Sequence, residues 1–124
     1  MNSEVRGIVV AHGALAPALV QEAERISGER GILAAVSNTE CGREQIEQRV
    51  AEAVAEGPAV VFVDMPCGSC FFAAMRVARG RSDVQVVTGV NLPMLLDFVH
   101  NRSLPPSDGA ARAAGKGSDA IRQV

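Results

Sequence analysis

The sequence predicts an α/β fold, a doubly wound and mainly parallel four-stranded sheet with helices on both faces. The chain has 124 residues, a length that suits one domain. Four short apolar runs recur along it, and each is followed by a segment with the apolar spacing of a helix. This alternation is typical of right-handed βαβ units, whose strands are parallel and whose helices cover the sheet.

The first half of the chain contains two of these strand–helix pairs. The β-branched run at residues 6–10 is the first expected strand, and residues 15–26 place their apolar side chains on one helical face before Gly28. Residues 32–36 form a weaker second strand. Residues 43–55 give the clearest helical pattern, with charged side chains between the inward positions.

The second half contains the other two pairs. Residues 59–63 (AVVFV) are expected to form a strand buried on both faces, and a turn follows at residues 64–68. Ser69 is expected to cap a helix that continues to residue 78. Residues 84–87 and 93–101 are the fourth strand and the fourth helix.

Residues 1–103 are expected to form the domain, and residues 104–124 a C-terminal tail. A hinge is predicted at residues 105–109, a turn of helix at 110–114, a glycine-containing breaker at 115–118 and a weak strand at 120–124. The tail has few large apolar side chains, so it should be frayed or should dock on another surface.

Composition excludes several classes of protein. A net charge of −2 with no basic cluster argues against binding to nucleic acid or to an anionic membrane. The apolar runs are too short to span a bilayer, and the first residues do not resemble a signal peptide. We therefore expect a cytoplasmic protein whose three cysteines are reduced.

Ligands of such sheets bind outside the carboxyl ends of the strands, which directs attention to residues 11–14, 37–42, 64–68 and 89–92. His12 directly follows the first strand, and a neutral imidazole can accept and release a phosphoryl group. The alternative is a loop histidine bonded to a backbone carbonyl. His100, at the end of a helix, is assigned no chemistry.

Asp64 ends the third strand, which should lie beside the first. Its carboxylate can accept the proton of the ring nitrogen of His12 that does not react, and this leaves the other nitrogen free to attack phosphorus. The alternative role for Asp64 is an ordinary turn residue. Gly68 and Ser69 then open a helix, whose free N–H groups suit a phosphate.

Three segments, GIVVAHG, VDMPCGSCFFAA and VVTGVNLPMLLDFV, together resemble the mannose-type IIA domains of the bacterial sugar phosphotransferase system (PTS). The resemblance covers about residues 5–100. It implies a phosphotransferase component in which His12 carries a phosphohistidine and Asp64 is its carboxylate partner. It also implies that the phosphate-binding residues are Gly13, Gly68, Ser69 and Asn91.

The same resemblance implies partners. The phosphoryl group would come from the phosphohistidine of the carrier protein HPr and pass to a IIB component for sugar transport. The chain would form a homodimer that exchanges a C-terminal edge strand, which would give the tail a place to dock. No cofactor is implied. A regulatory sensor of phosphorylation with the same fold, without sugar transport, is the alternative function.

The sequence departs from the family pattern at several positions. Cys67-Gly68-Ser69-Cys70 stands where the family usually has Gly-Gly-Ser-Pro, and Phe72 stands where it has Asn. Two cysteines at a helix start could be redox-active, or could bind a soft metal with Cys41 and His12. Because a single CxxC is a weak pattern and cysteine often fills a small buried space, we expect no metal site.

Overall fold

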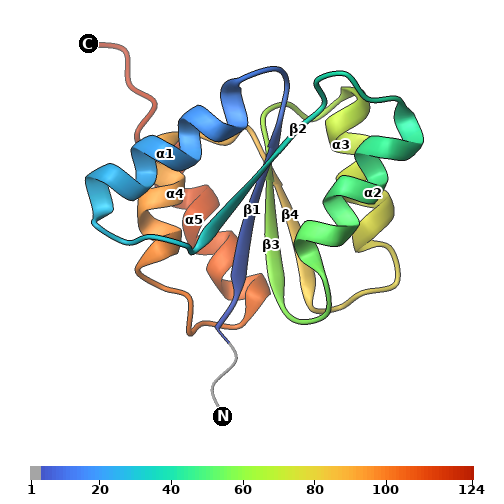
Figure 1. Ribbon diagram of the computed structural model, residues 1–124. Coiled ribbons are helices and arrows are strands. Elements are labelled where there is room, and N and C mark those ends of the chain that lie inside the picture. Colours follow the sequence, from blue (N-terminus) through green and yellow to red (C-terminus); the bar gives the residue numbers. More distant parts are fainter. Residues whose placement is uncertain (1–3) are drawn as a thin grey trace.

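The computed structural model describes residues 4–124, in which four parallel strands form one sheet in the order β2-β1-β3-β4 (Figure 1). The strands are β1 (Arg6–Ala11), β2 (Leu33–Ser37), β3 (Ala59–Val63) and β4 (Val84–Thr88). The predicted fold class is confirmed, and β3 lies beside β1 as expected. Val10 of β1 is in register with Val63 of β3, so these two strands end at the same level.

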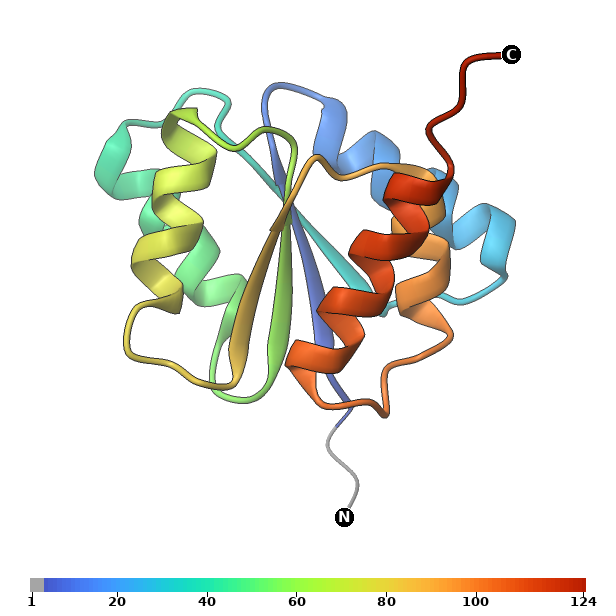
Figure 2. The same cartoon turned by 180° about the vertical axis from the view of Figure 1, so that it is seen from behind.

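Helices cover both faces of the sheet (Figures 1 and 2). One face carries α1 (Leu15–Ser27), α4 (Leu92–Val99) and α5 (Pro106–Asp119). The other face carries α2 (Arg43–Val54) and α3 (Gly68–Ala78). None of the helices described in residues 4–124 is both long enough and apolar enough to cross a membrane.

The core is divided by the sheet into two apolar layers, because alternate strand residues point to opposite faces. Phe62 lies in the layer under α1, α4 and α5, and its ring meets that of Phe98 edge to face at a centroid distance of 5.1 Å. Val61 and Val63 lie in the other layer, under α2 and α3. All five residues of β3 are buried, as the apolar run predicts.

The boundaries of α1 to α4 follow the predicted ones within one or two residues, but the predicted N-cap of α3 is not the observed one. Ser69 does not cap α3, so that prediction is wrong. The helix begins at Gly68 and Cys67 occupies the N-cap position, which places Ser69 inside the first turn. In the described part of the chain, no side chain caps the N–H groups at this end.

The tail differs most from its prediction. Instead of a hinge, a short turn and a breaker, residues 106–119 form one helix, α5, that packs against α4 and β4. Small residues on its inner face, among them Ala113 and Gly117, are buried and permit this close approach. Tertiary packing therefore overrides the low helix propensity of glycine. Residues 121–124 form no strand, and Ile121 is 78% exposed.

Candidate functional site

His12 lies immediately beyond β1, and one carboxylate oxygen holds both its backbone and its ring. The backbone N–H of His12 donates to Asp64 Oδ2 at 3.0 Å, and ring Nδ1 lies 2.8 Å from the same oxygen. A carboxylate only accepts hydrogen bonds, so Nδ1 carries the proton in this pair. The lone pair of the neutral ring is then on Nε2, the nucleophilic nitrogen.

Asp64, directly after β3, is an anion in a partly buried place. Its side chain is 9% exposed, and its Oδ1 has no hydrogen-bond partner in the described part of the chain. Burial by itself raises the pKa of this carboxyl, but the hydrogen bonds from the His12 backbone and ring outweigh it. The pKa of Asp64 therefore lies below its ordinary value, and the group is ionised at neutral pH.

The start of α3 faces the reactive side of the His12 ring. A Cβ placed on Gly68 would lie 3.7 Å from both Cε1 and Nε2 of His12. Gly68 has φ +89°, a conformation that other residues rarely adopt, so glycine permits this approach of the backbone. The uncapped N–H groups of the first turn thus open beside Nε2, where they can bind an anion.

Gly13 has a different environment from the one predicted for a phosphate ligand. Its N–H donates to Asn38 Oδ1 at 3.1 Å, and its carbonyl accepts from Ser37 Oγ at 2.6 Å. The turn after His12 is thereby held to the loop after β2. The loop was predicted at this edge of the sheet, but neither Ser37 nor Asn38 was predicted as a site residue.

Asn91 joins two helices. Its Oδ1 accepts from the backbone N–H of Met94 and so caps α4, while its Nδ2 donates to the carbonyl of Gly117 in α5, both at 3.1 Å. These two hydrogen bonds engage both the oxygen and the nitrogen of the side-chain amide. The predicted contact of Asn91 with phosphate stays a prediction.

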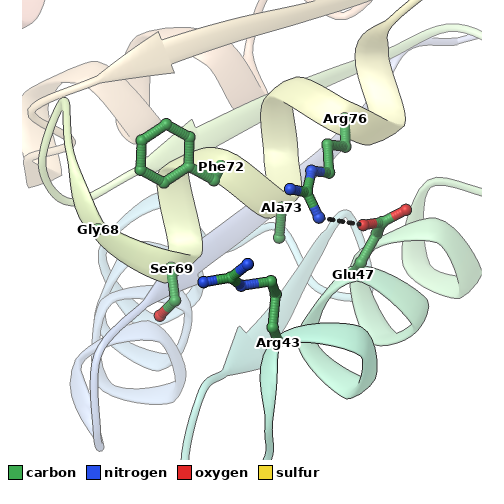
Figure 3. Close-up of a pocket in the computed structure, with 7 residues that line it drawn as sticks. All are labelled: Arg43, Glu47, Gly68, Ser69, Phe72, Ala73 and Arg76. Atoms are coloured by element: carbon green, nitrogen blue, oxygen red, sulfur yellow. Dashed lines mark hydrogen bonds and ion pairs between the residues drawn. The ribbon is translucent and has the colours of Figure 1, made fainter.

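A cavity of about 440 Å³ adjoins the start of α3. Figure 3 shows its lining residues from α2 and α3: Arg43, Glu47, Gly68, Ser69, Phe72, Ala73 and Arg76. The guanidinium of Arg43 points toward Ser69, whereas that of Arg76 pairs with Glu47 at 3.4 Å. Phe72 is 59% exposed at the rim. Neither arginine was predicted as a site residue, because their helical spacing is also that of an ordinary solvated face.

The four-ligand set of Cys41, Cys67, Cys70 and His12, which was the alternative to the expected absence of a metal site, is not brought together within residues 4–124. Cys67 is exposed, Cys41 is half-buried and bonds its thiol to the carbonyl of Asn38, and Cys70 is fully buried. Cys70 lies with His12 and Asp64, and one ligand atom from each lies within 4.8 Å of the others. Burial and the negative charge of Asp64 raise the pKa of Cys70 to about 11.

Comparison with known proteins gives one consistent result. The family described as "PTS system fructose IIA component" matches residues 7–114. A PTS sorbose-specific EIIA component from Klebsiella pneumoniae is 29% identical over 107 residues, which are 84% of this chain and 79% of that protein.

Solved structures show the same fold. Component EIIA from Streptococcus agalactiae has a TM-score of 0.88 at 19% identity, covering 96% of each chain. The mannose/sorbose-specific IIA subunit from Enterococcus faecalis has a TM-score of 0.85 at 21% identity, covering 98% of this chain and 95% of its own.

Proposed function

Because the chain belongs to the PTS fructose IIA component family, we propose that it is a phosphocarrier, which accepts a phosphoryl group on His12 from phospho-HPr and passes it to a IIB component. The observation that carries this proposal is the 2.8 Å contact between Nδ1 of His12 and Asp64. It directs the free lone pair of Nε2 toward the N–H groups of α3.

The proposed transfer uses the residues of the site in a definite order. The lone pair of Nε2 attacks phosphorus, the P–N bond of the donor phosphohistidine breaks, and the donor ring keeps that electron pair. The His12 ring gains positive charge, which Asp64 stabilises through Nδ1–H. The first turn of α3, with Gly68 and Ser69, binds the phosphoryl oxygens. Transfer to IIB repeats these steps with His12 as the donor.

The cavity beside Ser69 supplies a surface for the protein that brings or removes the phosphoryl group. It combines the exposed ring of Phe72 with the guanidinium of Arg43, while the guanidinium of Arg76 pairs with Glu47. An apolar side chain and a carboxylate on the partner would match these groups. Docking there would place the partner histidine on the Nε2 side of His12.

We also propose a homodimer, formed through the open edge of β4. Val86 and Val87 of this edge strand are only half-buried and lie in a groove of about 380 Å³ beside α5. Residues 120–124 of the second copy, which expose Ile121 and Val124, are the proposed occupant. Deletion of residues 120–124 leaves α5 complete and should convert a dimer to a monomer in sedimentation. A full chain that sediments as a monomer would contradict the proposal.

The phosphocarrier function is tested by incubating the chain with phosphoenolpyruvate, enzyme I and HPr, and then measuring its mass. One acid-labile phosphate should be gained. His12→Ala should abolish the gain, and His100→Ala, which changes an exposed residue at the end of α4, should not. Adding a IIB component should then remove the phosphate. If the phosphate remains on the chain with every IIB component supplied, the phosphocarrier function fails.

A further inference from the structure

Cys70 lies in an environment that its small size alone does not explain. Its thiol comes from the first turn of α3, and it meets a carboxylate from the end of β3 and a ring from the end of β1. Nitrogen, oxygen and sulfur ligand atoms of His12, Asp64 and Cys70 all lie within 4.8 Å of one another. Three separate segments thus bring three different metal-binding groups to one point.

The unpartnered oxygen of Asp64 is a second and independent sign of a ligand. The side chain is 91% buried, since 9% of it is exposed, yet Oδ1 has no hydrogen-bond partner within residues 4–124. Burial of such an anionic atom costs free energy unless a cation or a donor compensates it. A cation bound between Asp64 and Cys70 would supply that compensation.

The donor set and its accessibility fit one class of ion. Imidazole, carboxylate and thiolate together suit zinc(II) and similar borderline-soft divalent ions, which bind these atoms at about 2.0–2.3 Å. Ligands of one tetrahedral zinc lie about 3.3–3.8 Å apart. A separation at the 4.8 Å limit would therefore close by about 1 Å, and the 2.8 Å between Nδ1 of His12 and Oδ2 of Asp64 would open. His12 is 41% exposed, which gives the ion a path from solvent and leaves a fourth position for water.

We propose that His12, Asp64 and Cys70 form a three-ligand site for zinc(II) or a cation of the same class. Binding replaces the S–H bond of Cys70 by a metal–sulfur bond and releases one proton to solvent. The proton on Nδ1 of His12 moves to Nε2, so Nδ1 can bind the metal and its hydrogen bond to Asp64 is broken. The ring and the carboxylate that serve phosphoryl transfer are then occupied, so the cation inhibits the transfer; only this consequence rests on the proposed function.

Binding is tested on the reduced, metal-free full chain. Calorimetric titration with zinc(II), in two buffers of different ionisation enthalpy, should give one ion bound per chain and one proton released. Cobalt(II) should produce a thiolate-to-metal charge-transfer band in the near ultraviolet, because sulfur is a ligand. Absence of zinc binding, or a cobalt complex without that band, overturns the proposal.

Matched variants identify the sulfur. Cys70→Ser should remove the cobalt band and weaken zinc binding by more than about tenfold. Mutation of a residue that only hydrogen-bonds to a metal ligand already weakens binding by about tenfold, so loss of a ligand should cost at least as much. Cys67→Ser, three residues earlier and exposed, should leave both unchanged. If Cys70→Ser folds poorly, His12→Asn alters a half-exposed ring and should weaken zinc binding as strongly. Equal losses in the two serine variants would assign the metal to the CxxC pair instead and overturn the proposal.

The inhibition is measured separately. Zinc(II) should slow phosphoryl uptake by the wild-type chain and have less effect on Cys70→Ser. Normal uptake without any zinc binding would reject the metal site and leave the phosphocarrier function standing. Zinc binding in a chain that never takes up phosphate would reject the phosphocarrier function and leave the metal site standing.

Discussion

Asp64 joins three effects in one side chain: it orients the backbone of His12, fixes the proton on Nδ1 and places a negative charge beside the ring. Asp64→Asn keeps the size of the side chain but removes the charge. Phosphoryl uptake should fall by about 10²-fold, within the usual range for a positioned acid–base group, while the domain remains folded. Rapid-quench labelling from phospho-HPr measures this rate.

The matched control for that variant is Asp97, the other carboxylate within residues 4–124 that has an unpartnered buried oxygen. Asp97 pairs with Arg112 where α4 meets α5, so Asp97→Asn should leave uptake nearly unchanged. If uptake were equally fast in wild type and Asp64→Asn, Asp64 would be only a turn residue.

Asp64 also makes the free energy of unfolding depend on pH in the acidic range. Its folded pKa lies below its unfolded value of about 3.9. The stabilisation is therefore fully present above about pH 4 and is lost as the pH falls through the folded pKa. Denaturant unfolding of wild type should show this loss below about pH 4, and the same curve for Asp64→Asn should be flatter there.

The two cysteines of the CxxC sequence should differ in reactivity. Cys67 is exposed, whereas Cys70 is fully buried and its pKa is raised to about 11. Only the thiolate reacts with iodoacetamide, so Cys67 should be alkylated first at neutral pH and Cys70 should be protected until the chain unfolds. Mass mapping after a short pulse measures the order. Rapid labelling of Cys70 in the folded chain would contradict its burial.

At the scale of the elements, α5 depends on glycine for its fit. A Cβ on Gly117 would lie 2.7 Å from Met94 Cε and 3.0 Å from Asn91 Oδ1, the atom that caps α4. Gly117→Ala should therefore lower the free energy of unfolding by about 1 kcal/mol, since overpacking exceeds the gain in helix propensity.

Gly115 provides the matched control in the same helix. It is exposed, and a Cβ there would meet nothing within 4 Å. Gly115→Ala should raise the free energy of unfolding by about 0.5–1 kcal/mol. Chemical denaturation of both variants checks the opposite signs. Two changes of the same sign would show that α5 does not pack as described.

The facing surfaces of α2 and α3 should govern how partners approach. Arg43→Glu reverses the charge in the cavity and should slow uptake from phospho-HPr by about tenfold at low salt, with a smaller effect at high salt. Arg79→Glu, at the opposite end of α3, is the control of equal charge change. Equal rates of phosphoryl uptake in the two variants would show that the partner does not dock at the cavity.

Across the whole molecule, local patterns predict the sheet well because each strand is an apolar run between turns. The proximity of His12 and Asp64 was also predictable, since both follow strands expected to be neighbours in a parallel sheet. The sequence did not predict α5, because its glycines have low helix propensity and the helix is stabilised by its packing against α4 and β4.

The sequence also did not predict that Cys70 lies beside Asp64, for a different reason. A spacing of three residues places Cys67 and Cys70 near each other along the chain, but the face that each presents depends on where α3 begins. Because α3 begins at Gly68, Cys67 stays outside and Cys70 turns inward toward Asp64. Because the N-cap is Cys67, two residues before the predicted Ser69, Ser69 lies in the first turn.

The proposed function is tested most directly by determining which atom carries the phosphoryl group. Heteronuclear NMR of the chain labelled with ¹⁵N in histidine, recorded before and after phosphorylation through HPr, distinguishes the two ring nitrogens by their coupling to phosphorus. The hydrogen bond between Nδ1 of His12 and Asp64 predicts coupling at Nε2 of His12 and no phosphate on His100. Phosphorus bound to Nδ1 of His12, or to any other residue, would contradict the proposed role of Nε2.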